Sequence, residues 1–203
     1  MHIHSLVRIV ANLPVIRKLK PLVHFRPDFR LALLKCMPEG AHCAEIGVWK
    51  GEFSARIIAV TKPKMLHLVD PWMFRPQYPD RFYGGTAARG QKDMDDIFSE
   101  IKKKFGECEN IRIHRATSRE FLEEFTEHLD WIYIDGDHST EVVLEDLNLS
   151  SKMVKKSGII AGDDYYWKDS DGSLPVKIAV DKFCSEHGYN KKLIVGQFIL
   201  TLN

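Results

Sequence analysis

Residues 130–164, DWIYIDGDHSTEVVLEDLNLSSKMVKKSGIIAGDD, contain two short apolar runs on either side of an amphipathic stretch. The apolar runs predict strands near 131–135 and 158–162, and the stretch between them predicts a helix over about 139–154. Both expected strands end in carboxylates, Asp135 on the first and Asp163 and Asp164 after the second. Because unpaired carboxylates are costly to bury, these strand ends are expected to emerge at a ligand site or to be paired.

The same alternation continues outward in both directions and predicts a parallel sheet covered by helices on both faces. Further strands are expected near 42–46, 65–69 and 110–114, and further helices over about 28–37, 52–60, 92–105, 118–127 and 174–187. The end of the chain, KKLIVGQFILTLN, predicts a hairpin about Gly196. We therefore expect an α/β fold, a Rossmann-like three-layer sandwich with a mostly parallel seven-stranded sheet and a C-terminal antiparallel hairpin.

The composition suits one globular domain, expected over 28–203, since 44% of the 203 residues are apolar and 28% are charged. A formal net charge of +1 provides no field that would attract nucleic acid. No apolar run is long enough to span a bilayer, and four widely spaced cysteines without a CxxC motif favour a reducing cytosol. A cytoplasmic protein is expected.

Residues 1–27 form a basic extension without a single acidic residue, and their partly helical apolar spacing is broken by Pro14 and Pro21. A helical cap on the domain or on a second subunit is one reading, which would allow a homodimer. A membrane-surface element is the other.

Two strand ends favour a nucleoside ligand with a cationic end. In AEIGVWKGEFSARI, Glu45 occupies the place of the first glycine of a phosphate-binding loop, which disfavours a dinucleotide. Gly47 permits a tight turn, and Gly51 lets the next helix begin close to the strand. Asp70 ends the following strand, where it could accept ribose hydroxyls or act as a turn acid before Pro71.

The remaining strand ends carry capping and ion-binding candidates. Thr117 and Glu120 can form a capping box, with the Ser118 backbone N–H free for an adenine nitrogen. Asp137 is expected to be the N-cap of the helix from Ser139. The cluster of Asp135, Asp163 and Asp164 would repel without a cation, and all-oxygen ligation points to Mg²⁺ first, with Mn²⁺ or Ca²⁺ as alternatives.

The segment 71–93, rich in glycine, proline and aromatic residues, is expected to be a lid over this site. Aromatic residues in and near the site could stack on an acceptor ring or pack in the core: Tyr78, Phe82, Tyr83, Tyr165, Tyr166 and Trp167.

Taken together, the Glu45-x-Gly47-x-x-x-Gly51 loop, Asp70, Ser118, IDGDH and AGDDY resemble class I S-adenosylmethionine-dependent methyltransferases. More narrowly, they resemble small metal-dependent O-methyltransferases of the catechol and macrolide-sugar types, over about residues 30–203. The resemblance implies that cofactor contacts come from Glu45, Gly47, Gly51, Asp70, Ser118 and Asp135. It implies metal ligation by Asp135, Asp163 and Asp164, although the catechol type often has asparagine in place of Asp164.

His138 falls where the macrolide-sugar type has a histidine, which implies a general base for methyl transfer to a hydroxyl of a sugar, glycoside or catechol-like molecule. An imidazole with an ordinary pKa of about 6.5 can accept a proton near neutral pH. A structural histidine at the helix start is the alternative. Metal-independent methyl transfer and a non-catalytic nucleoside-binding scaffold are the rival functions.

Overall fold

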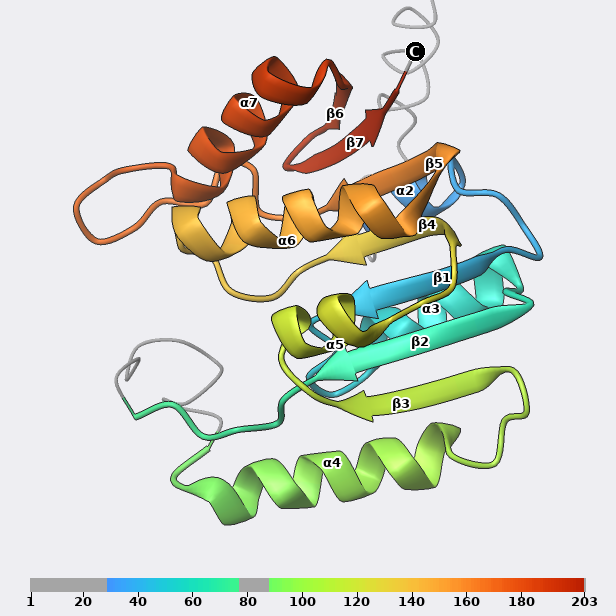
Figure 1. The fold of residues 1–203 in the computed structure, drawn as a ribbon. Coiled ribbons are helices and arrows are strands. Elements are labelled where there is room, and N and C mark those ends of the chain that lie inside the picture. Colours follow the sequence, from blue (N-terminus) through green and yellow to red (C-terminus); the bar gives the residue numbers. More distant parts are fainter. Residues whose placement is uncertain (1–28, 77–87, 203) are drawn as a thin grey trace, which may run out of the picture.

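A computed structural model describes residues 29–76 and 88–202 of the chain (Figure 1). The strands are β1 (His42–Ile46), β2 (Met65–Asp70), β3 (Ile111–Arg115), β4 (Leu129–Ile134), β5 (Val154–Gly162), β6 (Asn190–Ile194) and β7 (Gln197–Thr201). The helices in these residues are α2 (Phe29–Leu34), α3 (Glu52–Thr61), α4 (Gln91–Phe105), α5 (Ser118–Glu124), α6 (Thr140–Met153) and α7 (Pro175–His187). The predicted extension 1–27 lies outside the described residues, as do residues 77–87 of the predicted lid, which include Tyr78, Phe82 and Tyr83.

The strands form one seven-stranded sheet in the order β3-β2-β1-β4-β5-β7-β6. Neighbouring strands from β3 through β5 pair in parallel, whereas β7 pairs antiparallel with both β5 and β6. The predicted fold class and the C-terminal hairpin are therefore confirmed. Two helices are shorter than expected: α2 ends at Leu34, and α5 ends at Glu124 because the backbone of Phe125 is extended.

The hydrophobic core has two halves, one on each face of the sheet. The first half packs α2, α3 and α4 against the sheet through Leu33, Phe53, Ile57, Met94 and Ile101. The second half packs α5, α6 and α7 through Phe121, Val143, Leu147, Ala179 and Phe183. Helices thus cover both faces and leave the carboxyl edge of the parallel strands as the place for a site (Figure 1).

The strand register brings the predicted site residues into one row. Val69 pairs with Ile46, Ile46 with Ile134, and Ile134 with Gly162. At the level just beyond these pairs, side by side at the ends of four neighbouring strands, lie Asp70, Gly47, Asp135 and Asp163. Backbone hydrogen bonds from Gly47 to Val69 (2.9 Å), from Asp135 to Ile46 (2.8 Å) and from Asp163 to Ile134 (3.2 Å) extend the ladder through this row.

Beneath α5, three imidazoles form a hydrogen-bonded chain across β1, β2 and β3. Nε2 of His42 lies 2.8 Å from Nε2 of His67, whose Nδ1 lies 2.9 Å from Nε2 of His114. The rings of Phe121 and Phe125 cover this chain. Burial, followed by the neighbouring imidazoles, lowers the pKa of His67 to about 3. His67, at the centre of the chain, is therefore neutral at physiological pH.

The cysteines Cys36, Cys43, Cys108 and Cys184 are all free thiols, and Cys43 is buried. Among the described residues, every helix is too short or too polar to cross a membrane.

Candidate functional site

The loop after β1 owes its shape to two glycines with left-handed backbones. Gly47 (φ 90°) packs against β4 so closely that a Cβ atom would lie 2.0 Å from the carbonyl oxygen of Asp135. Gly51 (φ 68°) precedes α3, and there a Cβ would meet the side chains of Phe105 at 2.7 Å and Ile101 at 2.8 Å. Gly51 therefore makes room for α4, and not only for a close start of α3 against the strand.

Asp70 organises this loop from the end of β2. Its Oδ2 accepts the backbone N–H groups of Val48 (3.1 Å) and Trp49 (2.9 Å), and its Oδ1 accepts that of Trp72 (2.7 Å). The residue is only 2% exposed. The Trp72 indole in turn donates to the Trp49 carbonyl at 2.9 Å, so the loop after β1 and the segment after β2 are tied together.

Glu45 lies within β1 and is buried, with its Oε2 accepting the hydroxyl of Ser54 at 2.5 Å. Burial raises the pKa of Glu45 to about 8, and the Ser54 hydrogen bond opposes the rise. A positive ligand nearby would favour its ionised form. Glu45 is therefore a carboxyl group whose charge depends on what binds beside it.

The predicted capping box at α5 is present, with Thr117 and Glu120 each accepting a backbone N–H of the other. Ser118 is the first residue of α5 and is half-buried. Backbone N–H groups in a first helical turn have no acceptor within the helix, so this position can donate to a ligand.

Asp135 and Asp163 are joined by a cation that the sequence analysis did not predict. The Arg30 guanidinium, from α2, donates from Nε to Oδ2 of Asp163 (2.8 Å) and from Nη2 to Oδ2 of Asp135 (3.0 Å). The ring of Phe53 lies 5.2 Å below the guanidinium. The other oxygen of Asp163 accepts the Asp164 backbone N–H at 2.8 Å. Both oxygens of Asp163 are thus engaged.

The donor atoms that come together as a potential ion site belong to Asp135, His138 and Asp164, all within 4.8 Å of one another. Nε2 of His138 lies 3.2 Å from Oδ2 of Asp164 and 4.0 Å from Oδ1 of Asp135. Burial, together with the charge of Asp135, raises the pKa of Asp164 to about 6. Two carboxylates and one imidazole are a donor set that a divalent ion such as Mn²⁺ accepts. The set differs from the predicted one, because Asp163 faces Arg30.

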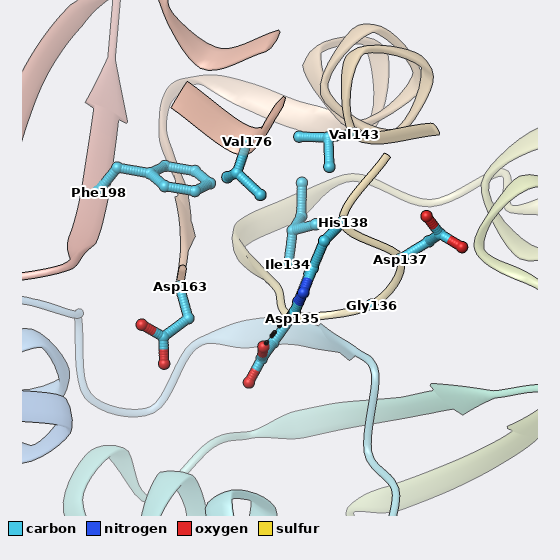
Figure 2. A pocket seen from close by; sticks show the side chains of 9 residues that line it. All are labelled: Ile134, Asp135, Gly136, Asp137, His138, Val143, Asp163, Val176 and Phe198. Carbon is cyan, nitrogen blue, oxygen red and sulfur yellow. Dashed lines mark ion pairs between the residues drawn. The ribbon is translucent and has the colours of Figure 1, made fainter. Parts of the chain in front are cut away.

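Asp137 points away from Asp135 and Asp163 (Figure 2). Its Oδ1 accepts the backbone N–H of Ser139 at 2.8 Å, and its Oδ2 pairs with Arg75 at 3.3 Å. The N-cap of α6 is Ser139, so the prediction that Asp137 caps this helix was wrong. The carboxylate shapes the turn before the helix instead.

A small pocket beside His138 has an apolar wall, formed by Ile134, Val143, Val176 and Phe198 (Figure 2). The Trp167 ring packs against the imidazole with the ring centroids 5.1 Å apart. Tyr165 is buried and donates its hydroxyl to Asp181 at 2.6 Å, so it is a packing residue, whereas Tyr166 is 51% exposed. His138 is thus held between carboxylates and an aromatic ring.

Comparisons with known proteins identify the family and the fold of this chain. The model of a methyltransferase-domain family matches residues 44–165, which is more than half of the chain. The chain belongs to this family. Its fold is that of the class I S-adenosylmethionine-dependent methyltransferases.

Individual relatives of this methyltransferase-family chain are distant. An uncharacterized protein (R132) of Acanthamoeba polyphaga mimivirus is 38% identical over 65 residues, which span 32% of this chain and only 28% of that protein. The solved structure of the O-methyltransferase NovP matches with a TM-score of 0.61 and 16% identity, over 86% of this chain and 80% of its own. The O-methyltransferase TomG from Streptomyces achromogenes, solved in complex with SAM, has a TM-score of 0.55 and 12% identity, with 100% of this chain and 92% of its own covered.

Sequence reasoning missed Arg30, although a signal was present. Arginine is unusual on the apolar face of a helix, and Arg30 shares the face of Leu33 and Leu34 by the i, i+3 and i, i+4 spacing. A charged residue on an otherwise core-facing stripe indicates a buried or half-buried partner of opposite charge.

Proposed function

We propose that this protein transfers a methyl group from S-adenosylmethionine to a hydroxyl group of a small molecule. The observation that carries the proposal is the single row at the carboxyl edge, which sets the Gly47 loop, Asp135 and Asp163 beside one another in a methyltransferase-family chain. His138 and Asp164 border the same row.

On the cofactor side, each residue has a distinct role in the proposal. The Gly47 turn admits the methionine end, and Glu45 faces its positive charge. Asp70 fixes the loop through the backbone N–H groups of Val48, Trp49 and Trp72, and we assign the ribose hydroxyls to its carboxylate at the end of β2. Ser118 offers its backbone N–H to the adenine ring. Gly51 supports the loop from beneath.

On the acceptor side, Asp135 and Asp164 would hold a Mg²⁺ or Mn²⁺ ion, which when bound makes a nearby hydroxyl more acidic. In this arrangement His138 does not bind the ion, and its Nε2, the nitrogen that faces this cluster, takes the hydroxyl proton. Asp164 orients the imidazole, and the Trp167 ring restricts its rotation. The exposed ring of Tyr166 is available to stack on a sugar or aromatic acceptor.

The test begins with calorimetric titration of S-adenosylmethionine and NAD, followed by methyl transfer from labelled cofactor to a panel of catechols and glycosides. Binding of S-adenosylmethionine but not NAD, with label appearing on a hydroxyl, is the expected result. Turnover should stop in chelator and return with Mg²⁺ or Mn²⁺. Absence of S-adenosylmethionine binding would leave the non-catalytic scaffold as the better reading.

One observation favours metal-independent methyl transfer as a second candidate. The Arg30 guanidinium already supplies positive charge to Asp135 and Asp163. Full turnover in chelator, in buffer stripped of metal, would select this candidate while keeping the methyltransferase assignment.

A further inference from the structure

Arg30 is directed into the site by the way α2 is anchored. Leu33 and Leu34 are fully buried in the core, and Arg30 lies one turn earlier on the same face of the helix. The side chain therefore extends over the ends of β4 and β5. It is 40% exposed, whereas the side chains of its partners Asp135 and Asp163 are only 18% and 13% exposed.

The guanidinium fits this position closely. Both Nε and Nη2 approach Oδ2 of Asp163, at 2.8 and 2.6 Å, and Nη2 also reaches Oδ2 of Asp135 at 3.0 Å. The Phe53 ring supports its face. Planar guanidinium groups bind carboxylates with several parallel donors, which a lysine at this position could not reproduce. This contact neutralises a carboxylate pair that would otherwise repel itself.

We propose that Arg30 is the resident cation of the Asp135–Asp163 pair and that it competes with a divalent ion for this site. For Asp163 to bind an ion as the sequence pattern predicted, the ion would have to share the carboxylate with Arg30, which donates to Oδ2, and with the Asp164 N–H, which donates to Oδ1. For an ion to bind Asp135 and Asp164 instead, it would lie beside the positive charge of Arg30, which contacts Asp135. Arg30 weakens ion binding in both arrangements.

The inference deepens the proposed function, since it concerns the metal dependence of the same site. Its consequence is that metal binding is conditional: it requires enough free ion, or a bound acceptor, to displace or outweigh the guanidinium. The wild-type protein should therefore fold, with Asp135 and Asp163 side by side, in the absence of metal.

The experiment measures Mn²⁺ binding directly, by electron paramagnetic resonance of the free ion, in the wild type and in Arg30→Gln. We expect Arg30→Gln to bind Mn²⁺ at least about tenfold more tightly, because a unit positive charge a few ångströms away has been removed. Arg56→Gln, which removes an exposed arginine from α3, is the matched control and should bind as the wild type does. Thermal unfolding should show a larger stabilisation by Mn²⁺ in Arg30→Gln than in the wild type.

Arg30→Met serves if the glutamine variant folds poorly, since its aliphatic chain keeps the contact with Phe53. Equal or weaker Mn²⁺ binding in both Arg30 variants would overturn the inference. Absence of Mn²⁺ binding in all variants would overturn it as well. S-adenosylmethionine affinity, measured in the same samples, reports separately on the methyltransferase proposal, which stands if the cofactor binds whatever the ion does.

Discussion

Gly47 and the backbone of Asp135 approach so closely that a single added carbon would lie 2.0 Å from the Asp135 carbonyl oxygen. We predict that Gly47→Ala destabilises the protein by at least about 2 kcal/mol more than Gly172→Ala. Both glycines have positive φ values, 90° and 84°, but a Cβ at Gly172 meets nothing within 4 Å. Both substitutions strain a left-handed backbone, so the difference between their free energies of unfolding, measured in urea, reports the steric overlap at Gly47. Equal losses would show that β1 and β4 can separate at this level without cost.

We predict that Asp70 contributes to cofactor binding partly by holding the loop after β1 in place. In Asp70→Asn, an amide NH₂ replaces one of the two oxygens that accept the N–H groups of Val48, Trp49 and Trp72. The free energy of unfolding should fall by about 1–3 kcal/mol, and S-adenosylmethionine affinity should fall about tenfold or more. Calorimetry and urea unfolding measure the two effects, with exposed Asp96→Asn as control. A stable variant with unchanged affinity would remove Asp70 from the cofactor site.

His138→Gln is expected to lower turnover of the true acceptor by roughly 10²–10⁴-fold, because a positioned base typically contributes that much. Affinity for S-adenosylmethionine should change little, since the residue borders the acceptor side. The rate of the wild type should rise with pH along a limb that the variant lacks. Steady-state kinetics across pH, with His187→Gln as an exposed control, will decide. Near-normal turnover with the same pH profile would make His138 structural.

The histidine chain predicts how stability depends on pH. The pKa of His67 is about 3 in the folded protein, against an unperturbed value of about 6.5. Between these values the unfolded chain binds a proton that the folded chain does not, so stability is lost as pH falls below about 6.5. At pH 4.5 this residue should account for about 2–3 kcal/mol of lost stability.

His67→Gln removes the titrating group, so the variant should lose less stability than the wild type between pH 7.5 and pH 4.5. Urea unfolding at the two pH values gives the difference, and exposed His187→Gln is the control. The variant will also be less stable than the wild type at pH 7.5, because His42 and His114 lose their partner. The informative quantity is therefore the change in the free energy of unfolding between the two pH values. The same change in both proteins would mean that other groups control acid sensitivity.

Much of the fold was predictable because its strands are short, apolar and separated by amphipathic helices. The expected strand at 42–46 has the observed bounds of β1, and the expected β4–β5 pairing is present. The start of β5 was missed by four residues because Lys155, Lys156 and Ser157 are exposed, which removes the apolar signal there. A local hydrophobic pattern thus identifies only the buried part of a strand.

The site was predictable to the extent that it follows strand ends. Asp135 and Asp163 were expected to be neighbours, and the sheet register makes them so. Their partner Arg30 lies 105 and 133 residues away in the sequence, so no local spacing connects it to them. The prediction that Asp137 caps α6 failed for a local reason. An aspartate shortly before a helix fits both the N-cap and the preceding turn, and only the backbone geometry distinguishes the two.

The position of β7 sets an order of events during synthesis. Although β6 precedes β7 in the chain, β7 lies between β5 and β6 in the sheet. A nascent chain that has emerged from the ribosome only as far as Ile194 therefore leaves β5 as an open edge, with the backbone of Ile160 to Gly162 unpaired on that side. The ring of Phe198 is also missing at that stage. In the folded protein this ring packs against Gly162, so closely that a Cβ added there would lie 2.3 Å from it. The strand before Asp163 therefore gains its second neighbour last. Ribosome-bound chains that stall before residue 197 should be more prone to aggregate and to bind chaperones than the full-length chain.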